Sequence, residues 1–228
     1  MNQYSQKPTC LTEGIKAAWP ICFGYLPIGM AFGVLAQKAG LYPLEIGLMS
    51  LLVFAGSAQF IAVSMLSSGA AFPTIILTTF IVNIRHLLMS SSLSVFLRGL
   101  GRGWVSIFAY GITDESFAVN INRFREGKWH WSQALAVNHI SNIFWIAGTV
   151  FGGLCGQLIP PGSFGIDYAL IAMFLCLLVF QLRGRIYVIT AAISALMAVG
   201  LSLWMPGNAY IIIAAVLATT IGVLIRRR

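Results

Sequence analysis

Charge is what this sequence has least of. Only 9% of its 228 residues are Asp, Glu, Lys or Arg, and just six of them are acidic. A soluble domain carries about 25% charged residues, so a water-soluble fold is excluded. Hydrophobic residues make up 58% of the chain, and the mean hydropathy is +0.86. We therefore expect an all-α integral membrane protein.

The net charge of +8 does not indicate nucleic-acid binding. The basic residues stand in short clusters between apolar runs, as they do in cytoplasmic loops that touch anionic lipid. The lipid bilayer, and not nucleic acid, is therefore the expected partner.

Motifs for enzymatic and metal chemistry are also missing. No CxxC occurs and the four cysteines are scattered, so neither a disulfide framework nor a zinc site is indicated. The sequence has no GxSxG, no HExxH and no phosphate-binding G-x-x-x-x-G-K-[ST]. We predict no catalytic residue, metal or cofactor. An intramembrane protease is the one enzyme class kept as a minor alternative.

Eight apolar runs approach the length of about 20 residues that a membrane-spanning helix needs. They lie at residues 17–37, 45–67, 72–97, 104–122, 132–158, 165–181, 186–205 and 209–225. We expect about eight transmembrane helices in a single domain of residues 1–228. Seven helices are the alternative, in which one run is only re-entrant.

Helix-breaking residues are frequent in the first half. Pro20 and Pro27 interrupt the first run and predict a kinked or broken helix there. Gly56 lies in the middle of the second run. The stretches "IPPGS" at 159–163 and "MPGN" at 205–208 have the composition of turns between spans.

Loop charges give the orientation. With eight spans and a cytoplasmic N-terminus, ten Lys and Arg fall inside and three outside, as the positive-inside rule requires. The inner residues are Lys7, Lys16, Arg123, Arg125, Lys128, Arg183, Arg185 and Arg226 to Arg228, and the outer ones are Lys38, Arg98 and Arg102. Both termini are thus predicted to be cytoplasmic. The loop "RGLGR" at 98–102 is the exception.

Polar residues gather in the second to fifth runs. An ionisable residue at the centre of a membrane helix costs about 2.5–3.5 kcal/mol on insertion scales, so such residues usually face an interior site. We expect the site within residues 17–158 and a scaffold within 165–225.

A polar stripe follows one face of the third run, because its members recur every three or four residues. They are Thr79, Asn83, His86, Ser90 and Ser94. Arg85 lies beside the stripe, without an acidic neighbour in the sequence. Asp114 and Glu115 of the fourth run are its predicted partners across the bundle. A purely structural ion pair is the alternative.

Further polar positions flank these. Ser57 and Gln59 lie in the second run, and Asn138 and Asn142 share a face of the fifth. His86 and His139 invite two interpretations. Histidine titrates near pH 6.5 and can carry protons, but neutral histidines fixed by hydrogen bonds are the plainer alternative.

Three blocks of this sequence are specific when taken together and in order. They are "LPIGMAFGVLAQKAGLYPLEIGLMSLLVFAGSAQF" at 26–60, "TTFIVNIRHLLMSSSL" at 78–93 and "GITDESFAV" at 111–119. They resemble the AzlC family, the large subunits of bacterial branched-chain amino acid exporters of the azaleucine-resistance type. The resemblance implies export of Leu, Ile, Val or analogues across the cytoplasmic (inner) membrane. It also implies a small hydrophobic membrane subunit of the AzlD type as partner.

An amino-acid zwitterion needs a cation for its carboxylate, an anion for its ammonium and an apolar pocket. Arg85 suits the carboxylate because its planar fork matches that geometry. The predicted substrate-binding residues are Arg85, Asn83, His86, Ser57, Gln59, Asp114, Asn138 and Asn142. The predicted proton-coupling residues, for an antiporter, are Asp114, Glu115 and His139.

Other functions are left open. A channel-like facilitator would use the same polar residues without a coupling group. The substrate of a transporter could instead be methionine or histidine, and a membrane scaffold would not transport at all. The segments "FAGSAQFIAVSM" and "GITDESFAVNIN" each join a polar patch to an apolar run, which suggests the inverted repeat common in transporters.

Overall fold

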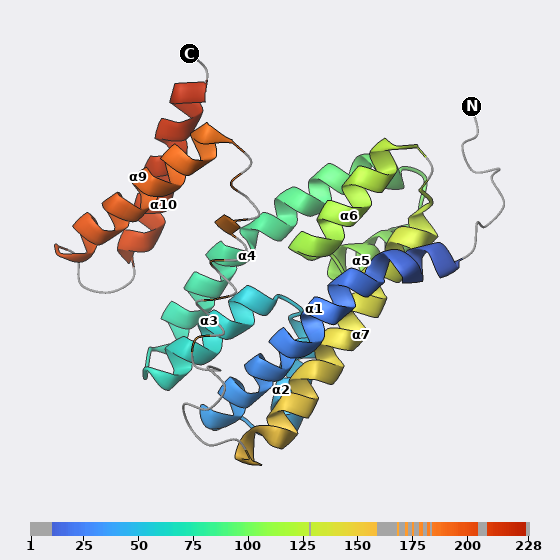
Figure 1. The fold of residues 1–228 in the computed structure, drawn as a ribbon, viewed down its shortest axis with the longest axis horizontal. Helices are drawn as coiled ribbons and strands as arrows, with labels where there is room; N and C mark the ends of the chain where they lie inside the picture. The colour runs from blue at the N-terminus through green and yellow to red at the C-terminus, as the bar shows by residue number, and fades with distance from the viewer. Residues whose placement is uncertain are drawn as a thin grey trace. The chain divides into compact units, whose positions relative to one another are not determined.

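The computed structural model describes residues 11–127, 129–158, 184–204 and 209–226, with six single positions between 168 and 182. All regular structure among these residues is helical (Figure 1). Contacts divide the chain into two compact units, Met1–Leu170 and Ile171–Arg228. The expected turns at 159–163 and 205–208 and most of the expected sixth span lie outside the described residues.

Four of the described helices are long and apolar enough to cross a membrane, so the chain is an all-helical membrane protein. They are α1 (Leu11–Lys38), α4 (Phe72–Ser94) continued by the 3-10 turn η1 (Val95–Leu97), α7 (Trp131–Cys155) continued by η2 (Gly156–Leu158), and α9 (Arg185–Ser202). These helices match the first, third, fifth and seventh runs. The eighth run is α10 (Ala209–Arg226), which pairs with α9 in the second unit.

α1 is one continuous helix, so of the predicted kinked or broken helix the broken form is wrong. Pro20 and Pro27 both lie inside its 28 residues. A membrane helix tolerates proline where neighbouring helices compensate the lost hydrogen bonds. α1 has such a neighbour, because it packs along the whole of α7.

Glycines set the distance between α1 and α7. A Cβ at Gly33 would lie 2.1 Å from the carbonyl oxygen of Thr149, so only glycine fits there. Gly14 faces Gln133 near the start of both helices, and Gly33 faces Gly152 near their ends. The two helices are therefore parallel, and their small residues let the backbones touch.

The second and fourth runs, predicted as single spans, are each two short helices. The second is α2 (Pro43–Leu52) and α3 (Gly56–Ser67), and the fourth is α5 (Arg102–Tyr110) and α6 (Asp114–Arg125). Three residues separate the helices in each case. Phe54 interrupts the first pair with a positive φ of 39°. Thr113 begins the second helix of the other pair, because its Oγ1 accepts from the Ser116 N–H at 3.3 Å.

Each pair folds back on itself as a hairpin. Nε2 of Gln59 in α3 donates to Oγ of Ser50 in α2 at 3.1 Å. Nine residues along a straight helix would separate these positions by about 13.5 Å. In the other pair, α5 starts where α7 starts, because Trp104 and Trp131 lie with ring centroids 5.4 Å apart. α6 ends beside η1, because the ring of Phe124 stacks on that of Phe96 at 4.9 Å.

The α2–α3 and α5–α6 hairpins point in opposite directions (Figure 1). The α5–α6 hairpin comes from the end of the unit where α1 and α7 begin. α2 starts at the other end, where Gly153 lies against Ile46. α3 ends there too, since residues 68–71 join it to the start of α4. The 26 residues of α4 and η1 then span about 39 Å back to Leu97.

The two halves of the first unit have matching elements. A helix of 10 or 9 residues is followed by a three-residue break, a helix of 12 residues and a long helix of 23 or 25 residues. The order α2–α3–α4 thus parallels α5–α6–α7, which is what an internal repeat would produce.

Candidate functional site

Arg85 of α4 lies where the tips of the two hairpins meet. Its Nη1 is 2.8 Å from Oδ2 of Asp114, the first residue of α6. Its Nη2 donates to Oγ of Ser57, the second residue of α3. Both charged side chains are 29% exposed. The predicted ion pair of Arg85 is therefore present, and it joins the N-terminal ends of two short helices.

The helix ends add to the electrostatics of this point. The N-terminus of a helix carries a partial positive charge, and both α3 and α6 begin beside Arg85. Asp114 is thus favoured twice, by the guanidinium and by its place in the first turn of α6. The local field attracts anions, and the carboxylate of Asp114 already occupies this position.

Arg85 keeps donor capacity. A guanidinium has five N–H donors, and its Nε is buried without a hydrogen-bond partner among the described residues. Oδ1 of Asn83, two residues earlier on α4, is also buried and unpartnered within that part of the chain. His86 is half-buried on the same helix, with Nδ1 3.3 Å from the carbonyl oxygen of Asn83. The structure thus brings Arg85, Asn83, His86, Ser57 and Asp114 to one region.

Tyr25 of α1 engages the tip of the α5–α6 hairpin from the other side. Its hydroxyl lies 2.6 Å from Oε2 of Glu115 and 2.7 Å from Oγ1 of Thr113. The two neighbouring acids are therefore held by different groups, Asp114 by Arg85 and Glu115 by Tyr25. Tyr25 is 7% exposed, so Glu115 has a protein donor that water hardly reaches.

Tyr110 ties the two tips together at their C-terminal helix ends. It is the last residue of α5, and its hydroxyl donates to the carbonyl oxygen of Leu51 near the end of α2. Nδ2 of Asn142 in α7 donates to the same hydroxyl at 3.4 Å. The ring of Tyr110 also stacks on that of His139, with centroids 6.2 Å apart.

A buried amide bridges each hairpin to α7. Besides donating to Ser50, Gln59 accepts from Nε1 of Trp145 through its Oε1 at 3.0 Å, and both Ser50 and Gln59 are fully buried. In the other hairpin, Asn138 of α7 donates to the carbonyl oxygen of Phe108 in α5 at 3.1 Å and accepts from Asn120 in α6 at 2.9 Å.

These amides are engaged by the protein itself. The structure therefore places Gln59 and Asn138 within the helix packing, away from open space. Asn142 contacts the tips through its hydrogen bond to Tyr110. The eight predicted substrate residues thus divide into Arg85, four residues near its side chain, and the amides of Gln59, Asn138 and Asn142, which hold the hairpins in place.

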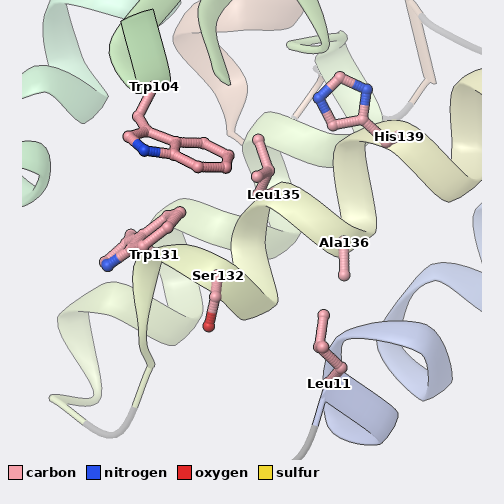
Figure 2. A pocket seen from close by; sticks show the side chains of 7 residues that line it. All are labelled: Leu11, Trp104, Trp131, Ser132, Leu135, Ala136 and His139. Carbon is pink, nitrogen blue, oxygen red and sulfur yellow. The ribbon is translucent and has the colours of Figure 1, made fainter. Parts of the chain in front are cut away.

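His139 lines a pocket of about 300 Å³ at the end of the unit where α1, α5 and α7 begin. Figure 2 shows the indoles of Trp104 and Trp131 near each other, with Leu135 between them and His139 in this view. Leu11, Ser132 and Ala136 complete the lining. Nε2 of His139 is buried and has no partner among residues that the structure describes.

Sequence reasoning misses two residues of this region, Tyr25 and Ser50. A single tyrosine between Pro20 and Pro27 in an apolar run gives no periodic signal, and Ser50 resembles any small residue of a span. Thr113 was detectable, because a threonine followed three residues later by Ser116 is an N-cap pattern. No group of three or more metal-ligating side chains occurs in the described part of the chain.

Known proteins are similar to this chain in sequence. The family model described as "AzlC protein" matches residues 20–159. The inner membrane protein YgaZ of Escherichia coli (strain K12) is 31% identical over 198 residues, which cover 83% of this chain and 81% of that protein. The branched-chain amino acid transport protein AzlC of Bacillus subtilis (strain 168) is 30% identical over 188 residues, 79% of this chain and 71% of that protein. No solved structure matches the chain.

Proposed function

Because this chain belongs to the AzlC family, we propose that it is a secondary transporter subunit that exports the branched-chain amino acids Leu, Ile and Val across the bacterial cytoplasmic membrane. The similarity to a named branched-chain amino acid transport protein supports the substrate class. A membrane protein of this length with a charged pair between broken helices supports transport over a scaffold role.

The observation that carries the proposal is the meeting of Ser57, Arg85 and Asp114. Transporters place discontinuous helices around their substrate, with half-helix N-termini aimed at anionic groups. The N-termini of α3 and α6 and the Arg85 guanidinium form such a point here. The carboxylate of the amino acid would bind Arg85, whose Nε is not used by the described residues.

The remaining predicted residues take roles around that point. Asp114 would receive the ammonium group, with Asn83 and His86 lining α4 beside it. Gln59, Asn138 and Asn142 would position the hairpins, since their amides contact protein groups. Branched side chains would lie against the aromatic rings of Tyr25, Phe54 and Trp145, which pack together.

Proton coupling is the energy source that we propose for export. Glu115, held by Tyr25 at 2.6 Å, and Asp114 are acids within the bundle, and His139 has an unused buried ring nitrogen among the described residues. An antiporter needs a group that alternates between proton and substrate, and these are the candidates. A channel-like facilitator would need none of them.

Residues 1–228 would form one transport domain with both termini in the cytoplasm. A small hydrophobic membrane subunit of the AzlD type would be its partner.

The test is leucine efflux from preloaded cells that carry this chain, with and without the small subunit. Arg85→Gln should abolish efflux while the protein still reaches the membrane, and Arg98→Gln, an exposed arginine, serves as control. Normal efflux from Arg85→Gln would refute the carboxylate site. If methionine or histidine competed with leucine and valine did not, the branched-chain substrate class would be wrong and the competing amino acid would take its place. Efflux insensitive to the proton gradient would favour the facilitator.

A further inference from the structure

We infer that the two hairpins enter the membrane from opposite faces, α5–α6 from the cytoplasm and α2–α3 from outside, and that their tips form the two gates of one site. The direction of each hairpin is independent of what the protein carries. The role as gates rests on the proposed transport function.

The lengths of the helices fit re-entrant segments. α2 and α3 have 10 and 12 residues, and α5 and α6 have 9 and 12. At 1.5 Å per residue they rise about 14–18 Å each, which is close to half of a hydrocarbon core of about 30 Å. Each hairpin therefore reaches the middle of the membrane and returns to the face that it came from.

The tips lie at half height of the long helices. Asp114 at the α6 tip binds Arg85, which is the fourteenth of the 26 residues of α4 and η1. Thr113 beside it binds Tyr25, the fifteenth of the 28 residues of α1. Backbone at the tips would be exposed to lipid if it lay on the surface. Instead, Gly56 and Gly111 at the two breaks pack against α7, on Trp145 and Asn138.

Charge assigns the faces. At the end where α1 and α7 begin, the described basic residues are Lys16, Arg98, Arg102, Arg123 and Arg125, whereas Lys38 is the one at the opposite end. The positive-inside rule places the first end in the cytoplasm. Eight full spans leave the RGLGR loop outside as an exception. With two re-entrant hairpins, Arg98 and Arg102 join the other basic loops and the exception disappears.

The gates follow from which tip covers which side of Arg85. The α5–α6 tip reaches Arg85 through Asp114 and would cover it on the cytoplasmic side. The α2–α3 tip reaches Arg85 through Ser57 and would cover it on the outer side. The hydrogen bond from Tyr110 to the carbonyl oxygen of Leu51 joins both gates. Access from the cytoplasm would open by movement of α5–α6 away from this bond, and access from outside by movement of α2–α3.

Cysteine labelling tests the direction of the hairpins. Ser68→Cys, between α3 and α4, and Gly101→Cys, just before α5, are placed one at a time in a chain whose four cysteines are replaced by alanine. Both positions are exposed, and a Cβ at Gly101 meets nothing within 4 Å. Leu44→Cys and Glu126→Cys are matched controls, because both topologies put residue 44 outside and residue 126 inside.

A membrane-impermeant maleimide should label residues 44 and 68 on intact cells, and residues 101 and 126 only after permeabilisation. Labelling of residue 101 but not 68 on intact cells would overturn the inference in favour of eight full spans. If the cysteine-free chain fails to reach the membrane, the same four substitutions in the native background, compared with the unsubstituted chain, give the same answer.

The role of the two tips as gates is tested by the side from which a cysteine at each tip can be labelled. Ala55→Cys and Ile112→Cys stand at the two tips, where the native side chains are 4% and 1% exposed. During leucine export, the maleimide should react with the Ala55→Cys variant at least tenfold faster from outside than from the cytoplasmic side. The Ile112→Cys variant should show the opposite preference. Equal reaction from both faces would overturn the gates. Correct sidedness without leucine export would count against the proposed function alone, and leucine export with residue 101 outside would count against the hairpins alone.

Discussion

Nη1 of Arg85 lies 2.8 Å from Oδ2 of Asp114, although the two residues belong to helices that a hydropathy plot treats as separate spans. The pair allows a simple separation of structural and functional roles. Asp114→Asn leaves the guanidinium without its counter-charge near two helix N-termini. Both side chains are 29% exposed, so we expect the single variant to lose less than about 3 kcal/mol of stability, the lower end of the cost of breaking a fully buried pair.

The double variant Arg85→Gln/Asp114→Asn removes both charges and should recover most of that loss. If the pair is only structural, the double variant also exports leucine. We expect it to accumulate in the membrane but to export less than one hundredth of the native rate. Thermal midpoints in detergent and efflux rates are measured on the native chain, Arg85→Gln, Asp114→Asn and the double variant, which completes the cycle.

Gly33→Ala should destabilise the chain more than a change to alanine at any other glycine of α1. The new Cβ would lie 2.1 Å from a backbone carbonyl oxygen and 2.5 Å from the N of Gly153, and backbone cannot move aside cheaply. Overpacking of this kind costs about 1–3 kcal/mol or more. Gly24→Ala is the matched control on the same helix, because nothing lies within 4 Å of its Cβ position. Equal thermal midpoints for the two variants would contradict the close contact of α1 with α7.

Gln59→Leu should weaken the α2–α3 hairpin without touching the substrate. It leaves the hydroxyl of Ser50 and Nε1 of Trp145 without their partner in a fully buried place, at a cost of about 1–3 kcal/mol. We expect a lower thermal midpoint and a lower amount of folded protein, with an unchanged KM for leucine in the fraction that remains. A raised KM at normal stability would make Gln59 a direct substrate ligand. Ser92→Ala, at an exposed position, is the control.

Tyr25→Phe should separate proton coupling from substrate binding. The change removes one hydroxyl, which lies 2.6 Å from Oε2 of Glu115, and keeps the ring that packs on Trp145. We expect efflux driven by a pH gradient to fall at least tenfold, while exchange of labelled for unlabelled leucine at equal pH continues. Tyr187→Phe in the second unit, 48% exposed, should change neither rate. Loss of both rates in Tyr25→Phe would instead assign Tyr25 to substrate binding.

Hydropathy and length were sufficient to predict α1, α4, α7 and α9, because a bilayer demands one apolar helix per crossing. For the same reason, hydropathy and length did not show that the second and fourth runs are each two helices. Both arms of a re-entrant hairpin lie in hydrocarbon, so the residues of α2 and α3 have the apolar character of one long span. The sequence marked Gly56 in the middle of the second run, and the break lies directly before it, at residues 53–55. The positive φ falls on Phe54, a conformation that no sequence pattern announces for phenylalanine.

The charged part of the site was more predictable than its neutral part. Arg85 in an apolar helix requires an acid, and the chain has few acids from which to choose, so Asp114 or Glu115 had to be its partner. Tyr25 requires no particular partner, since a tyrosine is tolerated in a membrane helix without a charged neighbour. Pro20 and Pro27 do not break α1, because the support that α7 gives to α1 is a property of tertiary packing and cannot be read from the first run.

The glycine contact between α1 and α7 has a consequence for how the protein is made. Between the end of α1 at Lys38 and the start of α7 at Trp131 lie 92 residues of the chain, so α1 leaves the ribosome long before its partner exists. The hydrogen bond between Gln59 and Trp145 likewise cannot form until Trp145 is synthesised, 86 residues later. The α2–α3 hairpin can therefore reach its final place only after α7 is synthesised, and a chain stalled before residue 131 would hold its first gate in lipid without the helix that anchors it.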